Sequence, residues 1–160
     1  MGEVERRLDD YLTCMIIIEP AFDFAHRFSE GVASIEIGSK YGYIDRTGTI
    51  IRGPEYSKAL PFSEGLAAVT TDTGTRFVDR TFHSVIEVSS GSCGPFSEGL
   101  ATVGGWKKEG YIDRTGSLII SLSAVSAENF DGGLARVCPQ HFDEWGYINK
   151  SGEFVWHPTR

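Results

Sequence analysis

The sequence predicts an all-β protein made of tandem β-hairpin repeats, each about 34 residues long. The segment Phe-Ser-Glu-Gly-Val-Ala at residues 28–33 recurs with Leu in place of Val at 62–67 and 96–101, and more loosely at 130–135, so each copy starts 34 residues after the previous one. Turn residues and short β-forming runs alternate within each copy, and no long helical pattern interrupts them. A fixed period with this content is typical of a repeat architecture.

The first strand of each copy is expected directly after the recurring segment. Ala33, Ile35 and Ile37 alternate at period two, so they share one face of a strand. Ala101 and Val103 repeat this face in a later copy. The spacing therefore predicts one strand with an apolar face in every repeat.

A hairpin is predicted next, with Tyr43 to Asp45 and Thr49 to Ile51 as its two arms. Asp45 can accept a hydrogen bond from a backbone amide two residues on, and Gly48 supplies a positive φ, which together predict a type I turn with a glycine bulge. The block recurs at 110–116 and, shifted by two inserted residues, at 145–152. The second copy has Phe82 in place of the turn glycine, so we expect a distorted or longer turn there.

The chain is predicted to be a single repeat domain over residues 1–160. Residues 52–61 form a connector for which we consider one short helical turn. The register divides the chain into a partial N-terminal repeat at 1–27, repeats at 28–61, 62–95 and 96–129, of which the second is degenerate, and a C-terminal repeat at 130–160. Because a single hairpin is marginal in water, the repeats must stack. We expect a twisted elongated array, with a propeller-like ring as the alternative.

The repeated pattern resembles the WG-repeat (KWG) family of bacterial proteins. The resemblance rests on Phe-x-Glu-Gly-Leu-Ala-x-Val, then Gly-Tyr-Ile-Asp-x-Thr-Gly, then an apolar pair and a proline, and it covers roughly residues 8–158. The Trp-Gly pair itself is present only as Trp145-Gly146; the other copies have Tyr41-Gly42, Thr75-Arg76 and Glu109-Gly110. The resemblance implies a β-rich module that serves as an interaction surface, with no catalytic residues to carry over.

Composition excludes some kinds of partner. The net charge is −7 and the longest cationic runs are pairs, so binding to a nucleic-acid backbone is not expected. No stretch approaches the 18 or so apolar residues of a membrane span. The N-terminus lacks the pattern of a secretory signal, so we expect a cytoplasmic protein.

Metal, cofactor and catalytic chemistry are not expected. The three cysteines, Cys14, Cys93 and Cys138, occupy three different positions of the repeat and do not form the paired spacing of a metal site. Carboxylates that recur in every copy, such as Glu64 and Asp79, are interpreted as structural, and the sequence does not indicate an enzyme.

Five residues are candidates for partner binding. Trp106 and Trp156 depart from the repeat pattern, so the repeat itself does not require them. His141 and Phe142 lie in the two-residue insertion, where a longer loop is expected, and Trp145 belongs to the surviving Trp-Gly pair. We expect a non-catalytic protein-binding or scaffolding module, with a carbohydrate or cell-envelope binding module as the alternative.

Overall fold

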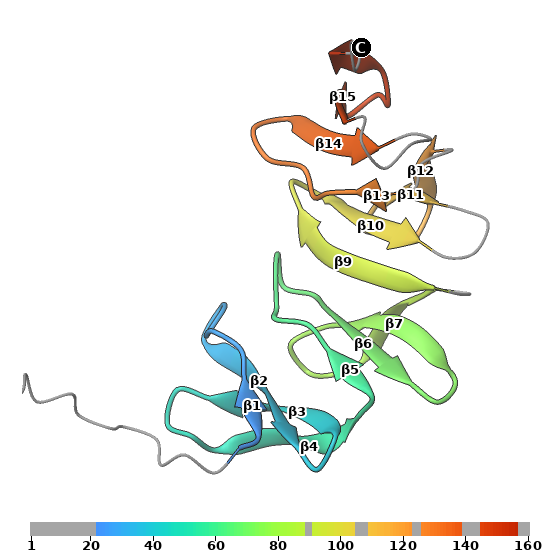
Figure 1. Ribbon diagram of the computed structural model, residues 1–160. Helices are drawn as coiled ribbons and strands as arrows, with labels where there is room; N and C mark the ends of the chain where they lie inside the picture. Colours follow the sequence, from blue (N-terminus) through green and yellow to red (C-terminus); the bar gives the residue numbers. More distant parts are fainter. Residues whose placement is uncertain (1–21, 89–90, 105–108, 123–125, 139–144, 157–160) are drawn as a thin grey trace, which may run out of the picture.

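The computed structural model describes residues 22–88, 91–104, 109–122, 126–138 and 145–156. These residues form sixteen β-strands and no helix. The strands make four antiparallel sheets, and in each sheet the four strands lie in chain order as a meander. Figure 1 shows the sheets following one another along a curved row, from blue to red. The all-β repeat class predicted from the sequence is confirmed.

Each sheet repeats the same four-strand plan. Sheet 1 contains β1 (Phe24–Ala25), β2 (Val32–Ile37), β3 (Lys40–Asp45) and β4 (Ile50–Tyr56). Sheet 2 contains β5 (Lys58–Ala59), β6 (Ala67–Thr71), β7 (Gly74–Val78) and β8 (Ser84–Val88). Sheet 3 contains β9 (Ser92–Ser97), β10 (Leu100–Gly104), β11 (Glu109–Ile112) and β12 (Leu118–Leu122). Sheet 4 contains β13 (Ser126–Ala127), β14 (Leu134–Cys138), β15 (Gly146–Asn149) and β16 (Phe154–Trp156).

The connector after each hairpin is extended, so the helical turn considered for residues 52–61 is wrong. β4 continues to Tyr56, and β5 then pairs with β6 as the first strand of sheet 2. Pro54 fits in β4 because β4 is an edge strand, where a missing amide hydrogen breaks no ladder bond. Each of sheets 2 to 4 therefore takes its first strand from the connector that follows the preceding sheet.

The turn between the third and fourth strands has the predicted geometry. The amide of Gly48 donates to the carbonyl oxygen of Asp45 over 3.1 Å, and Gly48 has a φ of 86°. The Asp45 carboxylate accepts a hydrogen bond from the backbone amide of Thr47 at 2.8 Å. These contacts close a type I turn with a glycine bulge.

The second copy forms the same turn, so the distortion expected at Phe82 is wrong. The amide of Phe82 donates to the carbonyl of Asp79 over 2.9 Å, and Phe82 itself adopts a φ of 63°. This left-handed conformation is uncommon for a bulky residue. The ring of Phe82 lies 5.4 Å from that of Tyr43 and 6.0 Å from that of Phe62, and this packing offsets the cost.

The turn aspartates predict that the fold loses stability in acid. Hydrogen bonds from the threonine side chains are the main reason that the pKa values of Asp45, Asp79 and Asp113 are lowered. Burial opposes this effect, and hydrogen bonds from backbone amides add to it. A lowered pKa means that the native state binds fewer protons than the unfolded chain, so stability is full above about pH 4 and falls as the pH drops through the folded pKa.

Melting temperature against pH, measured between about pH 2 and 7, tests this. Asn149 occupies the aspartate position of the fourth copy and accepts the same backbone bonds, at 3.0 Å each from Ser151 and Glu153. Asp113→Asn should therefore keep the turn and weaken the acid dependence. If the melting temperature of Asp113→Asn falls in acid as steeply as that of wild type, the contribution of the Asp113 carboxylate to the acid dependence is contradicted.

The core lies between adjacent sheets, which stack face to face. We call the face of a sheet that meets the following sheet its forward face, and the opposite face its rear face. Tyr43 on the forward face of sheet 1 is fully buried against Phe62, with ring centroids 5.3 Å apart. The same pairing recurs with Phe77 and Phe96 at 4.8 Å, and with Tyr111 and Phe130 at 4.7 Å.

A polar clamp on the turn between the first and second strands of sheets 1 to 3 also joins the sheets. Ser63 donates its hydroxyl hydrogen to the carbonyl of Phe96 in the next copy at 2.7 Å. The carboxylate of Glu64 accepts a hydrogen bond from the amide of Gly99 at 3.1 Å, and Arg114 lies 4.0 Å from it. Equivalent bonds join Ser29 to Phe62, Glu30 to Gly65, Ser97 to Phe130 and Glu98 to Gly133.

The clamp explains an unfavourable backbone conformation. Glu30, Glu64 and Glu98 have φ values of 51°, 53° and 53°, and each is followed by a glycine with positive φ. Two successive positive φ angles define a type I′ hairpin turn, which favours Asn-Gly or Gly-Gly over Glu-Gly. The glutamate stays in this position because its carboxylate reaches the following copy.

Two substitutions at Glu64 distinguish the stability that the clamp hydrogen bond contributes from the energetic cost of the positive φ. Glu64→Ala removes the contact to Gly99 but keeps the left-handed conformation, so it should lower the free energy of unfolding by about 1 kcal/mol. Glu64→Gly removes the same contact but also removes the cost of about 1 kcal/mol that a non-glycine residue has in the left-handed conformation. Its free energy of unfolding should therefore be close to that of wild type. Urea unfolding of both variants measures the difference. Equal stability of Glu64→Ala and wild type would contradict the clamp.

Candidate functional site: the open face of the last sheet

The forward face of sheet 4 is exposed, whereas the same face of every other sheet is buried. Tyr147 is 41% exposed, and the residues at its position in the other sheets are all 0% exposed. Leu134 is 39% exposed, against 4–8% for its equivalents. Trp156, paired opposite Tyr147 on β16, is 50% exposed. The equivalents are Tyr43, Phe77 and Tyr111 for Tyr147, and Val32, Leu66 and Leu100 for Leu134.

Two further side chains complete this face. Arg136 pairs with Tyr147 across β14 and β15, so both side chains lie on the forward face. The guanidinium carbon of Arg136 is 4.2 Å from the ring centroid of Trp145, in a cation–π contact. Arg136 also forms a two-point ion pair with Glu128. The hydrogen bond to Glu128 is the main reason that the pKa of Arg136 is raised. The contacts with Glu128 and Trp145 hold the guanidinium in place.

We call the surface made by Leu134, Arg136, Trp145, Tyr147 and Trp156 the end face. The rings of Tyr147 and Trp156 meet edge to face at 6.3 Å. The end face therefore combines exposed aromatic area with one anchored cation. Because exposed aromatic residues that stand on regular strands lose little conformational freedom on binding, this arrangement suits recognition of another molecule.

The end face is not shaped for a further repeat. Arg136 occupies a position that holds small residues in the other sheets; those residues are Ser34, Ala68 and Thr102. Trp156 stands where sheets 2 and 3 have Ile86 and Ile120. The clamp residues are also replaced, since Asp131 and Gly132 stand in the serine and glutamate positions. Gly132 keeps the positive φ, at 61°, without a carboxylate to reach forward.

Of the five residues predicted from the sequence, two lie together on the end face. They are Trp145 and Trp156, whereas Trp106, His141 and Phe142 lie outside the described residues. Leu134, Arg136 and Tyr147 were missed. Leu134 and Tyr147 match the repeat pattern, and residues at these positions are buried wherever another sheet packs on them. The sequence could have indicated their exposure only through their place in the last copy.

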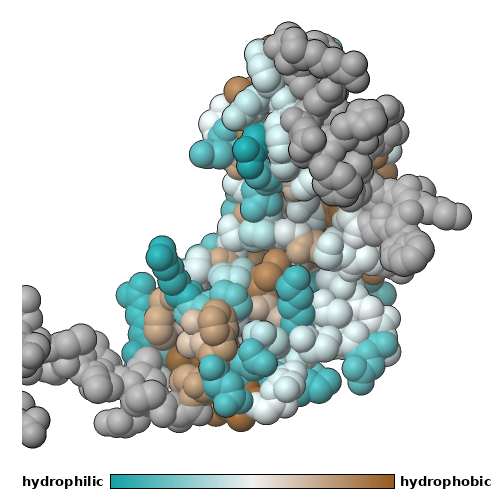
Figure 2. All heavy atoms as spheres, in the orientation of Figure 1, coloured by the Kyte–Doolittle hydropathy of each residue, from teal (hydrophilic) through white to brown (hydrophobic). Residues whose placement is uncertain are grey.

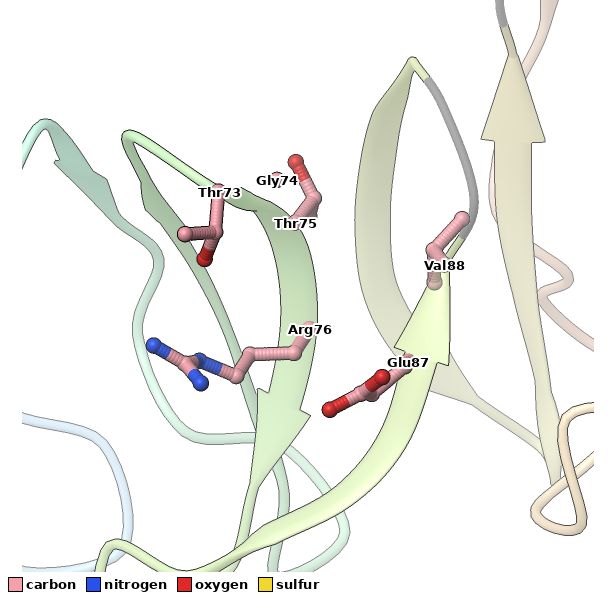
Figure 3. A pocket seen from close by; sticks show the side chains of 6 residues that line it. All are labelled: Thr73, Gly74, Thr75, Arg76, Glu87 and Val88. Atoms are coloured by element: carbon pink, nitrogen blue, oxygen red, sulfur yellow. The ribbon is translucent and has the colours of Figure 1, made fainter.

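A separate cleft of about 320 Å³ lies on sheet 2 (Figure 3). It opens beside Arg76, which replaces the glycine of the repeat pattern, and Glu87 lies directly opposite on β8. Thr75 and Val88 form the neighbouring pair. Arg76 and Glu87 carry opposite charges and both line the cleft, so the cleft does not favour an ionic ligand of either sign.

The cysteines of the described part are separate from the end face or buried. Cys93 lines a groove of about 380 Å³ along the first strands of sheets 2 to 4, together with Lys58 and Ser126. Burial raises the pKa of the Cys93 thiol to about 11, despite the nearby Lys58, so the thiol is protonated at neutral pH and is a weak nucleophile. Cys138 is buried in β14. Within the described ranges, no group of three or more His, Cys, Asp or Glu side chains is arranged to hold a metal ion.

No helix in the described ranges has the length and apolar character that crossing a membrane requires. Apolar residues also reach the surface over sheet 1 (Figure 2). On sheet 1 they are Phe24, Phe28, Ile50 and Ile51.

Comparison with solved structures shows likeness of fold. Hsv2p of Kluyveromyces lactis is 11% identical, with a TM-score of 0.54 over 81% of this chain and 48% of that chain. A eukaryotic initiation factor is 11% identical, with a TM-score of 0.57 over 85% of this chain and 44% of that one. These neighbours are β-propeller-like repeat proteins, and the chain spans less than half of their length.

Comparison with protein families is more specific. No curated protein matches the chain. The model of the WG containing repeat matches residues 15–41, 41–72, 110–138 and 145–158, which together exceed half of the chain. The unmatched stretch between residues 72 and 110 contains the degenerate hairpin with Arg76 and Phe82. The chain belongs to the WG-containing repeat family.

Proposed function

We propose that this chain is a protein-binding repeat module and that its partner docks on the end face. The observation that carries the proposal is the exposure of Tyr147 and Leu134, whose equivalents are buried in every sheet that has a following sheet. The first three sheets show what this face does when it is covered: it packs against another layer of protein.

The chemistry of the end face fits a protein partner. Trp, Tyr and Arg are the residues most enriched among those that dominate binding energy at protein interfaces. Here they stand on adjacent strands of one sheet, and Arg136 is held by Glu128 and Trp145. The replacement of the clamp by Asp131 and Gly132 supports a partner other than a fifth repeat of the same kind.

Binding assays with variants of the end face test the proposal. We expect proteins captured by the immobilised chain to include one whose affinity falls at least about 30-fold on Trp156→Ala or Tyr147→Ala, as for an interface hot spot. Ile119→Ala is the matched control, because Ile119 is 52% exposed on β12 of sheet 3. Capture that is insensitive to both end-face substitutions, or equally sensitive to Ile119→Ala, would contradict the proposal.

Carbohydrate binding is the second candidate, because Trp145, Tyr147 and Trp156 place three aromatic rings on one exposed face. A glycan array probed with wild type and Trp156→Ala distinguishes the two. A saccharide bound by the wild type alone would favour this candidate over the protein partner. A cytoplasmic location and the absence of catalysis stay predictions.

A further inference from the structure

Sheet 2 carries two opposite charges at positions where other copies have small residues. Arg76 stands on β7 in place of the glycine that the other three copies share. Glu87 stands directly opposite it on β8, where the first copy has Gly53 and the third has Ser121. The glycines at the position of Arg76 are Gly42, Gly110 and Gly146. The two charged residues therefore depart from the repeat pattern together, and both line the cleft of about 320 Å³ on this sheet.

The charged ends of Arg76 and Glu87 do not pair with each other. Directly opposite residues on neighbouring strands have Cβ atoms about 5 Å apart, which is close enough for an ion pair between these two side chains. Both side chains project to the same side of the sheet (Figure 3). Nevertheless, neither takes part in an ion pair of 4.0 Å or less within the described residues. The cleft therefore holds a cation and an anion that are near each other and unneutralised.

Each of the two charges keeps hydrogen-bonding capacity for a ligand. One guanidinium nitrogen of Arg76 lies 3.5 Å from the hydroxyl oxygen of Thr71. A guanidinium has five N–H donors, and two of them in parallel match the two oxygens of a carboxylate. The carboxylate of Glu87 is exposed and can only accept hydrogen bonds, so a primary ammonium with its three donors is complementary to it.

We infer that this cleft binds a free α-amino acid. The α-carboxylate pairs with Arg76 and the α-ammonium pairs with Glu87, so the ligand neutralises both charges of the cleft at once. A ligand with a single charge is attracted by one of these side chains and repelled by the other, which gives the site its selectivity for a zwitterion. Thr73, Thr75 and Val88 complete the lining. A volume of about 320 Å³ is at the lower end of the range for small-molecule sites, so it suits a ligand of this size.

L-alanine, L-serine and L-leucine are the probes, each titrated into the isotope-labelled full chain and followed by amide chemical shifts. We expect saturable shifts at Arg76 and Glu87 with at least one of them. The N-acetyl derivative of that amino acid keeps only the negative charge, and its amide derivative keeps only the positive charge. Both should bind at least about tenfold more weakly, since each loses one charge-assisted contact. Trp156→Ala on the end face should leave binding unchanged, so the test is independent of the partner proposed there.

Two variants separate binding from a purely structural role of the charges. Arg76→Gly restores the residue of the other copies, so the chain should stay folded and lose amino-acid binding at least about tenfold. Glu87→Gln keeps the shape of the side chain; it should weaken the amino acid by a similar factor but not weaken the N-acetyl derivative, which has no ammonium. Absence of any shift at Arg76 and Glu87 with tens of millimolar of each probe would overturn the inference. Equal affinity of the amino acid and its N-acetyl derivative would overturn it as well.

Discussion

Phe96→Ala is expected to lower the free energy of unfolding by about 3–5 kcal/mol, as for other large-to-small substitutions in a core. Phe96 is 1% exposed and packs against Phe77 between sheets 2 and 3. Removing its ring leaves a cavity in the middle of the array, where neither sheet can move without separating from its other neighbour. Urea unfolding followed by circular dichroism measures the change.

Phe28→Ala is the matched control, because Phe28 holds the same position in the repeat but is 42% exposed. Its substitution should cost less than about 1 kcal/mol, since most of the ring is already in contact with water. Equal losses at Phe28 and Phe96 would contradict the difference in burial between these two positions.

Gly110→Ala is expected to destabilise the fold by about 3 kcal/mol through overpacking. A Cβ atom at Gly110 would lie 2.0 Å from the carbonyl oxygen of Ile120 on the neighbouring strand. This is a backbone atom, so β11 and β12 would have to separate. The glycine of the Trp-Gly pattern therefore exists because the fourth strand approaches the third strand closely at this point.

Gly53→Ala provides the control for the loss of a glycine as such. Gly53 has no positive φ, and an added Cβ would have no atom within 4 Å. We expect its stability to equal or slightly exceed that of wild type. Thermal unfolding of both variants tests the pair. A Gly110→Ala protein as stable as Gly53→Ala would contradict the close approach of the two strands.

The sequence predicts the repeat, the strand after the recurring segment and the Asp-x-Thr turn, because each depends on local chemistry. Asp45 and Gly48 suffice for the turn wherever it occurs. The turn at Phe82 could not be predicted locally, since its conformation is stabilised by the ring of Tyr43, which lies one sheet away. The extended connector was missed for a similar reason: it becomes a strand only by pairing with β6.

The candidate site was predicted in part. Trp156 departs from the repeat pattern and Trp145 belongs to the surviving Trp-Gly pair, so both were noticed. Tyr147 matches the pattern, and its exposure depends on its place in the last sheet rather than on its own neighbours in sequence. The same applies to Phe28 at the first copy. In a repeat protein, equivalent residues differ in burial at the ends of the array, and a periodic pattern contains no information about where the stacking stops.

Hydroxyl-radical footprinting with mass spectrometry tests the central claim most directly. It compares the oxidation rates of Tyr147 and Trp156 with those of Tyr43 and Tyr111, which are fully buried. The structure predicts fast oxidation at Tyr147 and Trp156, slow oxidation at the two buried tyrosines, and selective protection of the end face when the partner binds. Equal protection of Tyr147 and Tyr111 in the isolated chain would show that the end face is already covered, and would contradict its assignment as an open binding surface.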